Sequence, residues 1–228
     1  MNGRLSVVAT PIGNLDDITL RALQTLGACD VVLCEDTRVT KKLLERHEID
    51  KPKLIRCDQH APAEKYAAII ELLRSGKHVA LVTDAGTPGV SDPGGLMVAE
   101  VVKALPDVRI EVIPGPSALT ALASIAGLPV DRFLFLGFLP LKHGRSAILD
   151  RIIASKETVF FYESKYRVQR TLEALATRLG DRMVVIGREL TKMHETVLRG
   201  TVSDVLALLE DGSTKGEFVV AIAGNRDN

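Results

Sequence analysis

The chain has 228 residues, of which 46% are apolar and 25% are charged. This composition is typical of a folded globular protein and excludes an intrinsically disordered chain. Lysine and arginine together equal aspartate and glutamate at 29 each, so the protein has no overall positive charge that would attract nucleic acid. Any contact with RNA must therefore come from a local patch.

The cysteines and the N-terminus bear on the cellular compartment. Cys29, Cys34 and Cys57 are odd in number, and their spacing matches neither a zinc site nor a disulfide framework. We therefore expect inert, reduced thiols. The N-terminal apolar run is too short for a signal peptide, and no stretch approaches the length of a membrane span. The expected location is cytoplasmic.

Short β-branched runs alternate with longer stretches of helical period, which predicts an α/β protein with a largely parallel sheet. In the first half, strands are predicted at 4–9, 30–34, 53–57, 78–82 and 109–113, with helices near 18–27, 38–47, 63–75 and 95–105. In the second half, strands are predicted at 132–139, 158–164, 182–190, 196–201 and 217–224, with helices near 144–155, 166–179 and 202–210. Two small domains that join near residues 114–117 are expected.

Three loops after predicted strands are unusual, and ligands bind at the carboxyl ends of strands in open α/β sheets. The first is "ATPIGNLDDITLRA" (9–22), in which Asp16 and Asp17 are expected at a helix N-cap. It has neither the G-x-G-x-x-G spacing of a dinucleotide fold nor the spacing of a P-loop. On local grounds it is equally well explained as a plain turn.

The second loop, "VTDAGTPGVSDPGG" (82–95), contains four glycines and two prolines. It is longer and stiffer than a connection from strand to helix requires. Glycine allows a ligand to approach the backbone closely and proline fixes the path of the chain, so a preorganised surface of backbone donors and acceptors is predicted. Such a surface suits an uncharged or zwitterionic ligand with an adenine-like edge. Two successive structural turns are the alternative.

The third loop, "VIPGPSALTALA" (112–123), ends a strand in Pro-Gly-Pro and places Ser117 before the next helix. Leu119 stands where a nucleophile elbow would have its second glycine. Ser117 is therefore predicted to be a helix cap or a ligand contact and not a nucleophile.

Charged side chains gather after three further predicted strands. The clusters are Glu35, Asp36 and Arg38; Tyr162, Glu163 and Ser164 with Lys165, Arg167 and Arg170; and Arg188, Glu189, Lys192 and His194. Each cluster alone suits a solvated strand end, but three in a neutral chain predict a polar cleft. Their cations together form the predicted patch for phosphate groups. The histidines match no metal-binding spacing, and no metal is expected.

In this order, the motifs resemble the small-subunit ribosomal RNA methyltransferase I family of the tetrapyrrole-methylase superfamily. The resemblance rests on "VATPIGNLDDITLRAL", "EDTRVTKKLL", "VALVTDAGTPGVSDPG", "IPGPSALTALASIAGLP", "DRFLFLGFLP", "FYES", "GRELTKMHE" and "LRGT". It extends from about Leu5 to Gly224, and site motifs of this length bear on function where a shared fold alone would not.

The resemblance implies the class III methyltransferase fold. An N-terminal domain (1–115) with a largely parallel sheet and a C-terminal mixed-sheet α/β domain (116–228) would hold S-adenosylmethionine in the cleft between them. It also implies a homodimer that methylates the ribose 2′-hydroxyl of a cytidine in the decoding region of 16S rRNA in the small ribosomal subunit. The implied donor contacts are Pro11, Gly13, Asp84, Gly86, Pro88, Gly89, Ser91, Pro114, Ser117 and Ala118, and the expected RNA contacts are Lys165, Arg167, Arg170 and Arg188.

Methyl transfer from a sulfonium is an in-line displacement that mainly requires aligned reactants. A ribose hydroxyl is a poor nucleophile until its proton is removed. We hypothesise that Glu35, Asp36 or Glu189 is the base. Arg38 and Lys192 would hold phosphate or lower the pKa of the hydroxyl.

The segment "ESKYR" (163–167) departs from the family pattern, because Lys165 and Tyr166 replace a proline and a histidine. Many relatives also continue for several dozen residues further. One alternative is a tetrapyrrole or other small-molecule methyltransferase of the same superfamily, which predicts an apolar acceptor cleft and no methylation of small ribosomal subunits. The other is a non-catalytic RNA- or ribosome-binding module, which donor binding would argue against.

Overall fold

The structure is a computed structural model that describes residues 3–50, 52–58, 61–210 and 216–225. The chain separates into two compact units, Met1–Ser117 and Ala118–Asn228. The division falls after Ser117, close to the expected boundary at residue 115. Each unit has its own sheet and its own apolar core.

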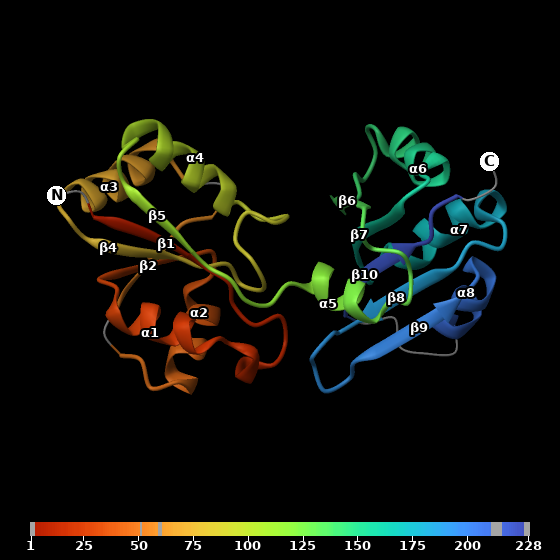
Figure 1. The fold of residues 1–228 in the computed structure, drawn as a ribbon, viewed down its shortest axis with the longest axis horizontal. Helices are drawn as coiled ribbons and strands as arrows, with labels where there is room; N and C mark the ends of the chain where they lie inside the picture. The colour runs from red at the N-terminus through yellow and green to blue at the C-terminus, as the bar shows by residue number, and fades with distance from the viewer. Residues whose placement is uncertain (1–2, 51, 59–60, 211–215, 226–228) are drawn as a thin grey trace. The chain divides into compact units, whose positions relative to one another are not determined.

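The first unit contains a five-stranded parallel sheet with the order β3-β2-β4-β1-β5 (Figure 1). Its strands are β1 (Arg4–Val8), β2 (Val31–Cys34), β3 (Lys53–Arg56), β4 (His78–Leu81) and β5 (Arg109–Ile113). Its helices are α1 (Leu20–Ala28), α2 (Thr37–Arg46), α3 (Ala63–Arg74) and α4 (Gly94–Ala104), with a short 3-10 helix η1 (Leu15–Asp17). Because all the strands run the same way, their carboxyl ends share one edge of the sheet.

Helices cover both faces of this sheet, which explains why its strand β2 is apolar at every position. Leu33 of β2 packs with residues of α3 and α4, whereas its neighbour Val32 packs with residues of α1 and α2. Successive side chains of a strand point to opposite faces, so a strand covered on both sides needs a continuous apolar run. Figure 1 shows α1 and α2 on one side of the sheet and α3 and α4 on the other.

The second unit contains a mixed sheet with the order β6-β7-β10-β8-β9. Only β6 and β7 are parallel, and the other neighbours are antiparallel. Its strands are β6 (Phe133–Phe138), β7 (Thr158–Ser164), β8 (Val184–Arg188), β9 (Thr196–Gly200) and β10 (Glu217–Ile222). Its helices are α5 (Ala118–Ile125), α6 (Arg145–Ala154), α7 (Val168–Leu179) and α8 (Val202–Glu210).

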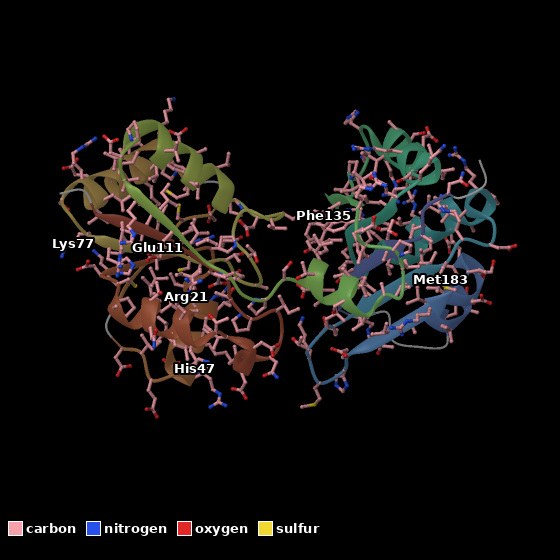
Figure 2. All side chains as sticks on the ribbon, viewed as in Figure 1. Arg21, His47, Lys77, Glu111, Phe135 and Met183 are labelled. Atoms are coloured by element: carbon pink, nitrogen blue, oxygen red, sulfur yellow. The ribbon has the colours of Figure 1, made fainter. Side chains whose placement is uncertain are left out.

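The two faces of the mixed sheet differ. One face packs under α6, α7 and α8 in a single apolar cluster that includes Phe161 and Leu172. The neighbouring residue of β7, Phe160, points the other way and meets the Phe133 ring edge-on at 5.3 Å. Phe135, labelled in Figure 2, lies on this second face, and α5 contacts the same sheet at β10.

The predicted strands and helices are all present, with ends that differ by at most two residues. The predicted α/β class, with a parallel first sheet and a mixed second sheet, is confirmed. The predicted N-cap at Asp16 and Asp17 is wrong, because these residues lie in η1 and Thr19 caps α1 by accepting a hydrogen bond from Ala22 N at 3.1 Å. No helix in the described part of the chain is long and apolar enough to span a membrane.

Candidate functional site

Three loops meet at the carboxyl edge of the first sheet. Thr10 and Gly86 exchange two backbone hydrogen bonds, of 2.9 and 3.1 Å. Thr87 Oγ1 donates to the Pro116 carbonyl oxygen at 3.2 Å. The contacts bring together the loops that follow β1, β4 and β5, which carry nine of the predicted donor contacts: Pro11, Gly13, Asp84, Gly86, Pro88, Gly89, Ser91, Pro114 and Ser117. The tenth, Ala118, begins α5 in the second unit.

The glycine-rich loop at 82–95 is braced by one aspartate. Asp92 Oδ1 accepts hydrogen bonds from the backbone N–H groups of Gly89 at 2.7 Å and Gly94 at 2.6 Å. Gly86 and Gly89 both have φ of 87°, a conformation that side chains disfavour. A Cβ at Gly94 would lie 3.0 Å from Gly89 N. The backbone itself therefore requires these glycines, and the loop is preorganised.

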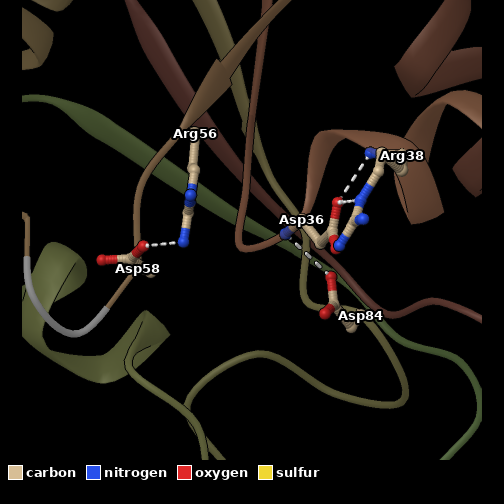
Figure 3. Close-up of polar contacts among 5 residues, drawn as sticks. All are labelled: Asp36, Arg38, Arg56, Asp58 and Asp84. Atoms are coloured by element: carbon tan, nitrogen blue, oxygen red, sulfur yellow. Dashed lines mark hydrogen bonds and ion pairs between the residues drawn. The ribbon is translucent and has the colours of Figure 1, made fainter.

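An acidic hollow of about 690 Å³ adjoins this loop in the first unit. It is lined by Glu35, Asp36, Arg56, Asp58, Asp84, Ser91, Asp92, Pro93 and Leu96. Carboxylates outnumber arginines in this lining, and Arg56 is itself paired with Asp58 at 2.8 Å (Figure 3). The hollow therefore favours cationic groups over phosphate.

Asp36 is the N-cap of α2, where its carboxylate accepts from Arg38 N at 2.8 Å and pairs with the Arg38 guanidinium. Figure 3 shows the two side chains facing each other. The hydrogen bond from the Arg38 side chain lowers the pKa of Asp36 to about 2. A carboxylate with so low a pKa is a weak base. Asp36 and Arg38 therefore form an ion pair that stabilises the N-terminus of α2.

Two other carboxylates in the hollow have different surroundings. Asp84 Oδ1 accepts from Asp36 N at 3.1 Å, and partial desolvation of its exposed side chain raises the pKa of Asp84. Glu35 Oε1 accepts from Thr83 Oγ1 at 2.6 Å. Raising the pKa makes a carboxylate a better proton acceptor, so Asp84 joins Glu35 as a candidate base. The sequence predicted Asp84 only as a donor contact, because the groups that partly desolvate it come from segments that no local motif identifies.

Glu189 and Lys192 lie in the second unit, in the turn after β8. Lys192 Nζ donates to Glu189 Oε1 at 3.0 Å and to Glu217 Oε2 at 2.9 Å. Burial alone would raise the pKa of Glu189, but hydrogen bonds from Glu217 N and from Lys192 lower it overall. Burial opposes the charge of Lys192, yet its two carboxylate partners raise its pKa. The structure thus brings this predicted base and cation together, each bound to the other.

The four cations predicted to contact RNA have different environments, all in the second unit. Arg170 is exposed, whereas Lys165 lies over the Tyr166 ring with Nζ 4.7 Å from its centroid. Arg167 is largely buried and pairs with Glu163 at 3.2 Å. Arg188 Nη1 donates to Thr196 Oγ1 at 3.3 Å. Arg167 is therefore engaged within the protein, Lys165 and Arg188 are half-buried, and Arg170 is the exposed one of the four.

Arg56, Asp58 and Asp92 of the first unit also line the hollow, although the sequence did not predict them as site residues. Arg56 ends β3 and Asp58 follows it, while Asp92 comes from the loop after β4. β2 lies between β3 and β4 in the sheet, and this order brings the segments to one hollow. The only local signal was Asp92 before Pro93 and two glycines, which is a turn pattern.

Comparison with known proteins identifies the family. The model of the Tetrapyrrole (Corrin/Porphyrin) Methylases matches residues 4–206. Ribosomal RNA small subunit methyltransferase I of Thermotoga maritima is 40% identical over 222 residues, which are 97% of this chain and 99% of that protein. The chain belongs to the ribosomal RNA small subunit methyltransferase I family. The predicted family and the predicted enzyme class, an S-adenosylmethionine-dependent methyltransferase, are confirmed.

Members of the family differ in length. The Bacillus subtilis ribosomal RNA small subunit methyltransferase I is 42% identical over 228 residues, which cover 99% of this chain but 76% of that protein. A more distant solved structure is uroporphyrin-III C-methyl transferase from Thermus thermophilus complexed with S-adenyl homocysteine. It superposes with a TM-score of 0.64 at 19% identity and covers 96% of this chain and 97% of its own. At that identity the likeness concerns the fold alone.

The first unit fits the methyl donor of this family. S-adenosylmethionine carries a sulfonium and an ammonium group, and the acidic hollow favours such cations. Asp92 Oδ2 is buried beside the glycine loop and accepts no hydrogen bond from the described residues. A buried acceptor without a partner is costly, so it suits a ligand that donates a hydrogen bond.

Proposed function

We propose that this protein transfers a methyl group from S-adenosylmethionine to the ribose 2′-hydroxyl of a cytidine in the decoding region of the 16S rRNA. The observation that carries the proposal is the similarity, over nearly the whole chain, to relatives named ribosomal RNA small subunit methyltransferase I. The preorganised loops and acidic hollow of the first unit support binding of the donor.

The donor supplies an electrophilic methyl group on its sulfonium. In our proposal the loops after β1, β4 and β5 hold the donor through backbone groups around Gly13, Gly86 and Gly89. The brace from Asp92 keeps the glycine loop in one conformation before the donor arrives. Preorganisation of this kind reduces the entropy lost on binding.

We propose Asp84, with Glu35 as the alternative, as the group that takes the proton from the ribose hydroxyl. Partial desolvation raises the pKa of Asp84, whereas the hydrogen bond from Arg38 lowers the pKa of Asp36. Glu189 also has a lowered pKa and is bound to Lys192. General-base catalysis favours the carboxylate with the raised pKa.

The two alternatives from the sequence are less well supported. A small-molecule methyltransferase is disfavoured by the similarity, over nearly the whole chain, to relatives named ribosomal RNA small subunit methyltransferase I. A non-catalytic binding module is disfavoured by membership of a methyltransferase family.

The test is to incubate the protein with labelled S-adenosylmethionine and small ribosomal subunits that lack the modification. We expect one labelled cytidine, with the methyl group on the ribose oxygen. Label on a base, or no label in RNA under conditions where donor binding is measured, would overturn the proposal. Matched subunits that already carry the modification are the control and should take up no label.

We further propose that the protein acts as a homodimer, on the strength of the family resemblance. The edge strand β5 of the first sheet carries Val112, whose side chain is well exposed. Sedimentation equilibrium at micromolar concentration should give twice the mass of the chain. A monomer at that concentration would contradict this part of the proposal.

A further inference from the structure

A buried polar network joins two loops of the second unit that the proposed reaction does not use. Glu163 of β7 is almost fully buried and accepts hydrogen bonds from Thr171 Oγ1 at 2.9 Å and from Ser164 N at 3.0 Å. Arg167 Nε lies 3.2 Å from the same carboxylate. Burying a carboxylate is costly unless it is paired and hydrogen-bonded, and here both conditions are met.

The network fixes the loop that follows β6. Arg167 Nη2 donates to the Leu139 carbonyl oxygen at 2.6 Å, and Arg145 Nη1 donates to the Pro140 carbonyl oxygen at 3.3 Å. Arg145 Nη2 also donates to Thr171 Oγ1 at 2.9 Å. The loop after β6 and the turn after β7 are therefore tied to each other, at the carboxyl ends of the only parallel strand pair in this sheet.

The tied loops and the last residue of β6 present large apolar side chains to solvent. Tyr166 is 83% exposed, Leu141 is 73% exposed and Phe138 is 59% exposed. Phe138 also contacts the Tyr162 ring, with 5.4 Å between centroids. Exposed apolar side chains gathered on one pair of rigid loops indicate a binding surface.

The charged side chains of the same segments are all basic. Residues 138–147 and 164–170 contain lysines, arginines and a histidine but no aspartate or glutamate. Lys142 and Arg170 are exposed, and in the described part of the chain neither forms a salt bridge. Lys165 covers one face of the Tyr166 ring. The combination is complementary to a polyanion that also has flat, apolar faces.

We propose that Phe138, Leu141, Lys142, Lys165, Tyr166 and Arg170 form an aromatic-basic surface that binds an unpaired stretch of RNA. One base stacks on Tyr166, and the flanking phosphates contact Lys142, Lys165 and Arg170. The inference rests on the proposed function, since it concerns how the same enzyme holds its RNA. Single-stranded nucleic acid is commonly held by aromatic rings that stack on bases beside cations that contact phosphate.

The charge of the acidic hollow in the first unit supports the proposal that the second unit binds the RNA. Its carboxylates repel phosphate groups, so the first unit offers the RNA backbone little attraction around Asp58 and Asp84. The chain is neutral overall, and a local basic surface is what it needs in order to bind RNA. The aromatic-basic surface provides one.

Binding of a fluorescent single-stranded RNA oligonucleotide to the full-length protein tests the inference without relying on methylation. We expect Tyr166→Ala to weaken binding roughly tenfold and Tyr166→Phe to retain it, because stacking needs only the ring. Lys142→Gln should reduce the slope of log affinity against log salt by about 0.7, the value for one lost phosphate contact on a single strand. Lys103→Gln, on the exposed side of α4, and Leu208→Ala, on α8, are the matched controls and should change neither quantity.

A second readout is methylation of the small subunit. The Tyr166→Ala variant should have a raised KM for RNA, with kcat and donor affinity unchanged. If the wild-type protein fails to methylate RNA but binds the oligonucleotide through Tyr166, the proposed function is overturned. The inference that the aromatic-basic surface binds RNA is then still supported. If Tyr166→Ala and Lys142→Gln bind RNA as the wild type does, or if Tyr166→Ala changes the oligomeric state instead, the inference is overturned. Equally tight, Tyr166-independent binding of duplex RNA or of anionic vesicles would also overturn it.

Discussion

Asp84 and Asp36 are carboxylates on the same hollow, yet their surroundings move their pKa values in opposite directions. The side chain of Arg38 holds the pKa of Asp36 at about 2, while partial desolvation raises the pKa of Asp84 above its ordinary value of 3.8. Pairs of carboxylates with diverging pKa values commonly divide acid-base and structural roles. In this pair, Asp84 is the candidate base and Asp36 the helix cap.

We therefore expect Asp84→Asn to lower kcat by at least about a hundredfold, the usual contribution of a general base. Asp36→Asn should have a much smaller effect. The base must be deprotonated, so wild-type kcat should fall as the pH drops through the pKa of Asp84, at higher pH than for an ordinary aspartate. The measurement is the pH profile of kcat at saturating S-adenosylmethionine.

Calorimetry of donor binding is the control for this pair of variants. Asp84→Asn should bind the donor with nearly wild-type affinity. If it instead loses donor affinity while kcat at saturation persists, Asp84 is a donor contact, as the sequence motif suggested, and the base lies elsewhere.

His78 lies in a buried polar cluster at the other end of the first sheet. Arg4 Nη2 lies 3.1 Å from His78 Nδ1, and Ser6 Oγ lies 2.8 Å from His78 Nε2 and donates to Glu111 Oε1 at 2.7 Å. Figure 2 labels Glu111 on β5. An arginine can only donate, so Nδ1 is an acceptor and the imidazole is neutral with its proton on Nε2. Burial, helped by the charge of Arg4, lowers the pKa of His78.

This lowered pKa predicts a loss of stability in mild acid. Below about pH 6.5 the unfolded chain takes up a proton at His78 that the folded chain accepts only at lower pH, so the free energy of unfolding should fall as the pH drops from 7 towards 5. Urea denaturation across this range measures the slope. The paired carboxylates Asp30 and Glu111 have lowered pKa values and lose their contribution only at more acidic pH.

His78→Gln should flatten the slope of stability against pH. The exposed His143 is the matched control, and His143→Gln should leave the slope unchanged. An unchanged slope in His78→Gln would mean that another group takes up the proton.

At the scale of the elements, the glycine loop links backbone strain to donor binding. Gly86 has φ of 87° and forms the bridge to Thr10, and a Cβ there would lie 3.6 Å from Ile12 Cγ2, an ordinary contact. Gly86→Ala should therefore fold but lose about 1–2 kcal/mol of stability from the left-handed backbone. We also expect it to weaken S-adenosylmethionine binding, because the bridge sets the position of two proposed donor loops.

Gly127 provides a matched comparison. It has φ of 69° with open space around the missing Cβ, so Gly127→Ala imposes similar backbone strain in the second unit, at a residue that belongs to none of the proposed loops. Calorimetry should show normal donor affinity for Gly127→Ala and reduced affinity for Gly86→Ala. Equal affinities in the two variants would remove Gly86 from the donor site.

The elements also show what a sequence can predict. The run "DVVLC" (30–34) predicts a strand, and in the structure β2 is buried at every position because helices cover both faces of the sheet. The N-cap of α1 was misplaced because η1 adds a turn before Thr19, and both Asp16 and Thr19 are good capping residues. The hollow was only partly predicted: Arg56 joins Asp84 there through the order of the strands, which no local pattern specifies.

At the scale of the whole molecule, a neutral chain separates its charges. The first unit carries the acidic hollow, and the second carries the basic loops around Lys142 and Lys165. A cationic donor and an anionic RNA therefore find opposite potentials on different parts of one chain. Net charge alone could not have indicated either preference.

The apolar cores separate in the same way, and this predicts independent folding. Both clusters of the first unit lie within residues 3–117, and the cluster of the second unit lies wholly beyond Ser117. Residues 1–117 expressed alone should therefore unfold in urea in one cooperative transition. Circular dichroism measures this transition.

A shorter fragment that ends at Leu105 is the control for this experiment. It lacks β5, which pairs with β1 along its whole length and contributes Ile113 to the core under α1 and α2. Because that loss exposes the central strand β1 and opens the core, the shorter fragment should show no sharp transition. A fragment of residues 1–117 that unfolds as gradually as the shorter one would mean that the first unit depends on the second for its stability.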